Sequence, residues 1–127
     1  MPVAKLNDVV HSGVSPLTAK AILGDVDLGP LFTGQTATGT TQATAFPISA
    51  ATTVFGTAPA SSGAVLPTLS AGDEVWVTNY GANTLTVYPP VGGAINNGSA
   101  NAGVSIAANG TTAFKCVSSN GLNYASK

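Results

Sequence analysis

Short β-prone runs, separated by turn-forming residues, dominate this chain from residue 43 onward. The separators are clusters of Gly, Pro, Asn and Ser that recur at short intervals. The runs are ATAFPIS, TTVFGT, AVLPTL, EVWVTN, LTVYP, VSIAA, TTAFKCVS and LNYAS. About eight short strands with this spacing are typical of an all-β sandwich. We therefore predict an all-β fold with a β-sandwich or jelly-roll-like body.

Three hairpins are predicted within this body. Asn109-Gly110 lies between SIAA and TTAFKC, and Asn120-Gly121 lies between KCVS and LNYA. Asn-Gly favours the positive φ angles of a type I′ turn, whose twist matches that of paired strands. The third hairpin, VWVTNYGANTLTVY, is expected to turn through Gly81-Ala82-Asn83.

The stretch LTVYPPVGGAINNGSANAGVSI, residues 85–106, starts as a strand and then changes character. Pro89-Pro90 should end the strand because proline has no N–H to donate to a ladder, and Gly92-Gly93 allows a sharp bend. We expect Ile95 to plug the core before Val104 and Ile106 re-enter a sheet. The stretch is therefore predicted to be a corner between two sheets, which we favour over a ligand-binding loop.

Residues 1–32 form a distinct segment that carries most of the charged side chains. Within it, SPLTAKAILG predicts a short helix with Ser15 as N-cap, Pro16 in the first turn and Gly24 as the stop. The other apolar residues there are too few for a core of their own. We therefore divide the chain into an N-terminal arm, 1–32, and a β body, 33–127. The arm residues predicted to contact a partner are Leu6, Val9, Val10, Val14 and Leu17.

Charge is scarce, and this excludes several classes of partner. Charged residues make up 7% of the 127 residues, with four lysines, no arginine and a net charge of −1. Such a chain cannot neutralise phosphates, so we expect no nucleic-acid or membrane partner. A neutral surface is poorly suited to solubility unless other subunits cover it, which favours a component of an assembly. The N-terminus lacks a signal-peptide pattern, so we expect synthesis in a cytoplasm.

Residues suited to catalysis or metal binding are too few to form a site. His11 and Cys116 are the only histidine and cysteine, which rules out a structural zinc site built from one chain. Cys116 alternates with Phe114 and is predicted to be a small buried residue. Two acidic pairs are predicted to be solvated turns: Asp25 with Asp27, and Asp73 with Glu74. We therefore expect no enzymatic activity, no metal and no cofactor.

The aromatic residues offer one alternative function. Aromatic side chains on a sheet face can stack sugar rings, and the candidates here are Trp76, Tyr80, Tyr88 and Tyr124. Trp76 alternates with Val75 and Val77, so it should face the opposite side of its strand. We favour packing or subunit contact for Trp76 over glycan stacking, and we include it among the partner-binding candidates.

Residues 72–124 resemble a C-terminal pattern of small virion proteins of tailed bacteriophages. The pattern consists of a V-x-N-x-G turn, the strand and bend L-T-V-Y-P-P-x-G-G-x-I-N, a loop of small residues and an Asn-Gly hairpin before the last aromatic strand. The resemblance implies a head decoration or cement protein, or a head-fibre or tail component.

This resemblance implies a structural role on the capsid exterior of a virion. The expected mechanism is attachment of the arm and neutral surface to the major capsid protein lattice, at subunit joints, by a homotrimer. The alternative function is a receptor- or glycan-binding module of a phage fibre or tail.

Overall fold

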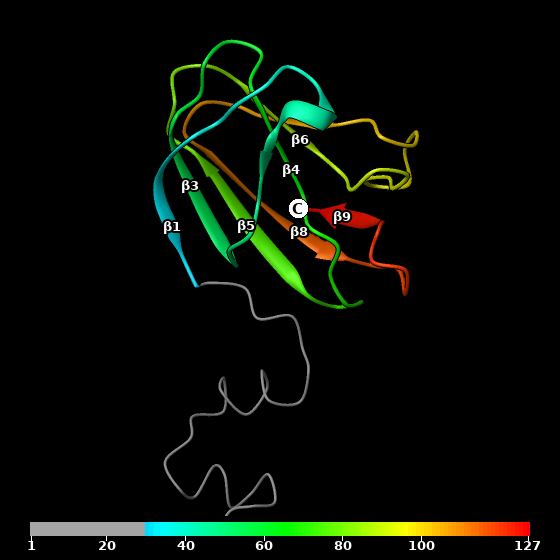
Figure 1. Ribbon diagram of the computed structural model, residues 1–127. Coiled ribbons are helices and arrows are strands. Elements are labelled where there is room, and N and C mark those ends of the chain that lie inside the picture. The colour runs from blue at the N-terminus through cyan, green and yellow to red at the C-terminus, as the bar shows by residue number, and fades with distance from the viewer. Residues whose placement is uncertain (1–29) are drawn as a thin grey trace, which may run out of the picture.

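A computed structural model describes residues 30–127, which fold into two facing β-sheets (Figure 1). The all-β prediction is confirmed. The predicted helix at 15–24 and the five arm residues proposed for partner contact lie outside the described residues. Within the described part of the chain, no helix is long and apolar enough to cross a membrane.

The larger sheet has five strands in the order β1-β3-β5-β8-β9. They are β1 (Phe32–Thr36), β3 (Thr52–Thr57), β5 (Glu74–Asn79), β8 (Gly110–Cys116) and β9 (Tyr124–Ser126). The smaller sheet has four strands in the order β2-β4-β6-β7. They are β2 (Phe46–Pro47), β4 (Gly63–Val65), β6 (Leu85–Tyr88) and β7 (Val104–Ile106), and a 3-10 turn, η1 (Gln42–Thr44), precedes β2.

From β1 to β6 the chain alternates between the two sheets. Each strand is followed by a strand of the other sheet, so that neighbours within a sheet run parallel: β1 with β3, β3 with β5, β2 with β4 and β4 with β6. The last three strands pair antiparallel, β7 with β6, β8 with β5 and β9 with β8. Parallel neighbours require a crossover connection, and here each crossover contains a strand of the opposite sheet.

Changes of sheet between consecutive strands explain why two of the three predicted hairpins are wrong. Gly81-Ala82-Asn83 connects β5 to β6, and Asn109-Gly110 connects β7 to β8, but in both cases the two strands belong to different sheets. The Asn109 N–H donates to the carbonyl of Asn79 (2.6 Å), which fixes this turn against the end of β5.

The hairpin at Asn120-Gly121 is confirmed, because β8 and β9 pair antiparallel around it. Its turn differs from the expected type I′, which needs two positive φ angles. Gly121 has a φ of 77°, whereas Asn120 is not among the residues with positive φ.

Residues 85–106 do not form a corner between sheets. Leu85 pairs with Ile106 and Val87 with Val104, so β6 and β7 are antiparallel neighbours joined by a long loop. Two parts of the prediction are confirmed: β6 ends immediately before Pro89, and Ile95 is buried. The loop reaches the other sheet, because Ile95 forms an isolated bridge with Tyr124 of β9.

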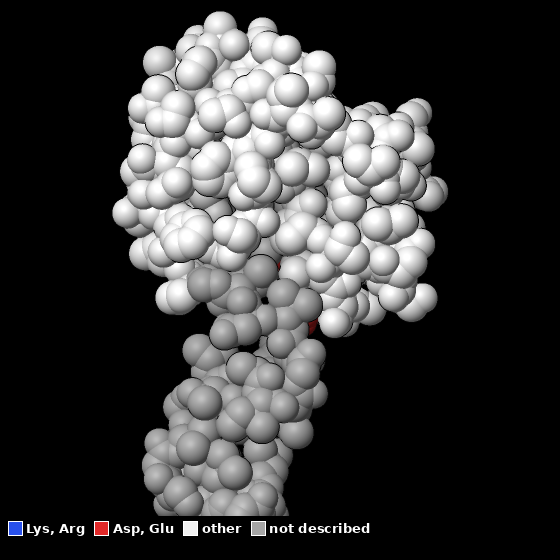
Figure 2. All heavy atoms as spheres, in the orientation of Figure 1, with Lys and Arg blue, Asp and Glu red and all other residues white. Residues whose placement is uncertain are grey.

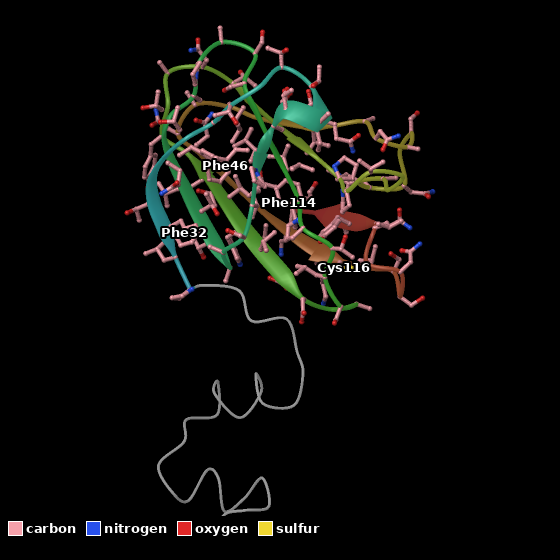
Figure 3. All side chains as sticks on the ribbon, in the orientation of Figure 1. Phe32, Phe46, Phe114 and Cys116 are labelled. Carbon is pink, nitrogen blue, oxygen red and sulfur yellow. The ribbon has the colours of Figure 1, made fainter. Side chains whose placement is uncertain are left out.

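The core lies between the two sheets. Alternate residues of β5, Val75 and Val77, point inward and are fully buried, as is Phe114 of β8. The Phe46 ring packs edge-on against Phe55 with their centroids 5.2 Å apart. Figure 3 shows Phe46, Phe114 and Cys116 lying among the strands of the body, with Phe32 at the sheet edge. Cys116 is buried as part of this core, as predicted.

Candidate functional site

The candidate site is on the outer face of the five-stranded sheet, around Trp76. Strand alternation turns Val75 and Val77 inward and Trp76 outward, as predicted. The cross-strand neighbours of Trp76 are Thr52 on β3 and Ala113 on β8. Both are small, so they cover little of the indole, and 47% of the Trp76 surface remains exposed.

A groove of about 570 Å³ adjoins the indole. It is lined by Glu74, Trp76, Ala113, Lys115, Ala125, Ser126 and Lys127. The sheet register builds it: Glu74 lies directly opposite Lys115, which in turn lies opposite Ala125 of β9. The groove therefore has an apolar floor and a charged rim.

The charged side chains of the described residues are concentrated at this groove. Residues 30–127 contain only four charged side chains, Asp73, Glu74, Lys115 and Lys127, and the last three line the groove. Two lysines and one glutamate give the side chains of the lining a formal charge of +1. By contrast, the face of the body drawn in Figure 2 is almost entirely free of charged atoms.

The three tyrosines do not join Trp76 in an aromatic platform. Tyr80 is exposed just beyond the far end of β5, and Tyr88 lies on β6 of the other sheet. Tyr124 is fully buried; its hydroxyl donates to the carbonyl of Pro67, and burial raises its pKa well above the usual range. Trp76 is therefore the one aromatic residue of the four that lines the groove.

The V-x-N-x-G turn, residues 77–81, has a structural role. Asn79 is completely buried, and its side-chain amide donates to the carbonyls of Asn83 (2.8 Å) and Ile106 (3.0 Å). Its side-chain oxygen accepts the N–H of Gly81 at 2.9 Å. Asn79 thus ties the β5–β6 connection to β7 of the opposite sheet.

The bend after β6 is also explained by packing. A Cβ added to Gly93 would lie 1.9 Å from the carbonyl oxygen of Leu122, so no larger residue fits there without movement. The side chain of Asn96 donates to the Ser126 hydroxyl (2.7 Å) and accepts the Ser126 N–H (2.9 Å). These residues anchor the loop to the β8–β9 hairpin.

The groove could be predicted only in part from the sequence. Trp76 was among the predicted partner-binding residues, whereas Ala113, Lys115 and Ala125 were not. Alternation within TTAFKC does place Ala113 and Lys115 on the face opposite Phe114. What the sequence did not show is the pairing of β5 with β8, which brings these residues beside Trp76.

Among residues 30–127, no group of three or more His, Cys, Asp or Glu side chains is placed to hold a metal ion. Comparisons of the chain with protein-family models, with curated proteins and with solved structures find no match.

Proposed function

We propose that this protein is a structural, non-enzymatic component of a tailed-bacteriophage virion that decorates the capsid exterior. It would bind at joints of the major capsid protein lattice, as a homotrimer, and add contacts between neighbouring capsid subunits. The observation that carries this proposal is the neutral surface of the β body away from the Trp76 groove (Figure 2). The resemblance of residues 72–124 to small phage virion proteins supports it.

A neutral surface limits the kinds of contact through which the protein can bind a partner. With four charged side chains on residues 30–127, long-range attraction to a charged partner is weak. Apolar and neutral hydrogen-bonding contacts remain, and exposed apolar side chains are available at Leu31 beside the body and at Val91 and Val117 on it. Attachment would combine these contacts with the arm residues Leu6, Val9, Val10, Val14 and Leu17.

Salt dependence tests this mechanism. Exposed ion pairs are screened over about 10 Å at 0.1 M salt and about 3 Å at 1 M, whereas apolar burial is little affected or strengthened by excluded salts. We expect binding to purified capsids, measured by co-sedimentation, to change by less than about threefold between about 50 mM and 1 M NaCl, or roughly 0.7 kcal/mol. Release by salt would contradict attachment through neutral surfaces.

Copy number and oligomeric state complete the test. Quantitative mass spectrometry of purified virions should find the chain in the high copy number of a lattice-wide component. Light scattering of the isolated protein should give a trimer, whose interface would bury about 800 Å² per partner if it is of standard size. A few copies per virion would favour a fibre or tail component instead.

A second function, binding a receptor or a glycan at a fibre or tail, is favoured by one observation. The half-exposed indole of Trp76 borders a groove with an apolar floor and a polar rim, an arrangement that suits a sugar ring. Free sugars added to the co-sedimentation assay distinguish the two functions. A decoration protein should remain bound, whereas a glycan-binding module should be released.

A further inference from the structure

The geometry points to the Trp76 groove as the docking site for residues 24–29 of the same chain. Docking there, which we call the clasp, would hold the end of the arm against the body. The groove needs an occupant with both apolar and acidic groups, because its floor is apolar and its lining carries a net positive charge. The sequence GDVDLG at 24–29 has this composition, with Val26 and Leu28 alternating with Asp25 and Asp27.

Strand direction places the start of the described chain at the same end of the sheet as the groove. β1, β3 and β5 are parallel, so all three begin at one end of the sheet. Glu74, the first residue of β5, is at that end, and Lys115 of the antiparallel β8 lies directly opposite it. Residues preceding Phe32 therefore enter the sheet at the end that carries the charged rim.

The connecting chain is long enough to reach the groove. Neighbouring strands are about 4.8 Å apart, so β5 lies about 10 Å and β8 about 14 Å from β1 across the sheet. Four residues lie between Asp27 and Phe32, and an extended chain over these five residue steps spans about 16 Å. Leu28 can therefore reach Trp76, and Asp27 comes within reach of the long Lys115 side chain, without any rearrangement of the body.

Charge complementarity favours this segment over other occupants. The two aspartates at 25 and 27 carry a formal charge of −2, opposite in sign to the groove lining. With Val26 and Leu28 against the indole, the flexible side chains of Lys115 and Lys127 can extend past them toward the carboxylates. On residues 30–127, a second copy of the neutral β body offers no acidic side chains except Asp73 and Glu74, and Glu74 belongs to its own groove.

This inference does not depend on the proposed capsid binding, but it is compatible with it. If residues 24–29 stay on the body, residues 1–23 remain available to a partner, and these include the five apolar residues named above. The clasp would fix the position of residues 24–29 on the body. The arm would then lose less conformational entropy when it binds a partner.

The single tryptophan provides a direct test on the full chain. Acrylamide quenching of Trp76 fluorescence should increase at least about twofold when the clasp is removed, because the covered indole becomes exposed to solvent. We expect this increase for the Asp25→Asn/Asp27→Asn variant and for the Val26→Ser/Leu28→Ser variant. Asp8→Asn, which removes an arm carboxylate outside the segment, is the matched control and should leave quenching unchanged.

Zero-length carbodiimide crosslinking of the wild-type chain provides the second readout. Mass spectrometry should find Asp25 or Asp27 joined to Lys115 or Lys127, with the Glu74–Lys115 crosslink as an internal positive control. Both readouts should be unchanged between about 1 and 100 µM protein, because docking within one chain does not depend on concentration.

Three results would overturn the proposal. The first is equal quenching of the wild type and both segment variants, together with a Glu74–Lys115 crosslink but none to Asp25 or Asp27. The second is protection of Trp76 that grows with protein concentration, which would assign the groove to a second copy. The third is protection of Trp76 from quenching by free mono- or oligosaccharides, to the same extent in the wild type and in both segment variants. That result would assign the groove to a glycan.

Discussion

The two faces of the five-stranded sheet are built from the same strands but have different roles. On β5, Val75, Val77 and Asn79 face the second sheet and are buried, whereas Glu74 and Trp76 face outward and are exposed. The inner face is packed against the core, and the outer face carries the groove. A single strand with period-two alternation can therefore serve stability on one side and recognition on the other.

The largest expected difference between the faces comes from removing an aromatic ring on each. Phe114→Ala on the inner face should lower the free energy of unfolding by about 3–5 kcal/mol, because a fully buried ring is replaced by a cavity. Trp76→Ala on the outer face should cost less than about 1 kcal/mol, because half of the indole is already in water. Urea denaturation measures both. Similar losses would show that the outer face is also part of the core.

The next effect concerns the buried polar side chain of the inner face. Asn79→Ala should lower stability by about 2–3 kcal/mol, since it leaves the carbonyl of Ile106 and the N–H of Gly81 without their partner. Asn97→Gly is a suitable control: Asn97 is exposed, and glycine accepts its positive φ of 58°. If the two variants lose equal stability, the network around Asn79 does not contribute as we infer.

The fold was more predictable than its topology, and Asn79 shows why. Alternation in EVWVTN correctly places Val75 and Val77 on one face of the strand and Trp76 on the other, because the face of a side chain depends only on its position along the strand. Strand pairing depends on contacts distant in sequence. The turn at Gly81-Ala82-Asn83 resembles a hairpin turn, yet the Asn79 side chain binds the carbonyl of Ile106 on β7 and so directs the chain into the other sheet.

The same limit applies to the candidate site. The outward direction of Trp76 follows from local alternation, but the groove requires Ala113, Lys115 and Ala125 from two strands more than 35 residues further along the chain. Likewise, PPVGGAIN correctly predicted the end of β6 and the burial of Ile95. It could not show that the loop returns to pair with β6, because that pairing depends on Val104 and Ile106.

A smaller effect is expected at the edge of the inner face, where β9 contributes Tyr124. Tyr124→Phe should cost about 1 kcal/mol at neutral pH through the lost hydrogen bond to the carbonyl of Pro67. Burial raises the pKa of Tyr124 above its ordinary value of 10, so the folded state resists deprotonation. The contribution of Tyr124 should be complete below about pH 10 and should decline above it, by up to about 1.4 kcal/mol per pH unit.

Stability measured by urea denaturation from pH 8 to 11 checks the sign of this linkage. The wild type should lose stability above pH 10 more steeply than Tyr124→Phe. Tyr80→Phe, at an exposed position, should follow the wild type. Parallel curves for the wild type and Tyr124→Phe would show that the hydroxyl is not protected by burial.

The smallest effect should come from the charged rim of the outer face. Glu74 and Lys115 are directly opposite each other on β5 and β8, and both are exposed. Exposed cross-strand pairs of opposite charge contribute about 0.2–1 kcal/mol, so Glu74→Gln should change the free energy of unfolding by less than about 0.5 kcal/mol. A double-mutant cycle with Lys115→Gln, at low and high salt, isolates the pair. A coupling energy above about 1 kcal/mol would mean that Glu74 and Lys115 form a stable ion pair with each other. A small coupling would leave Lys115 free to bind a ligand carboxylate, as a recognition face requires.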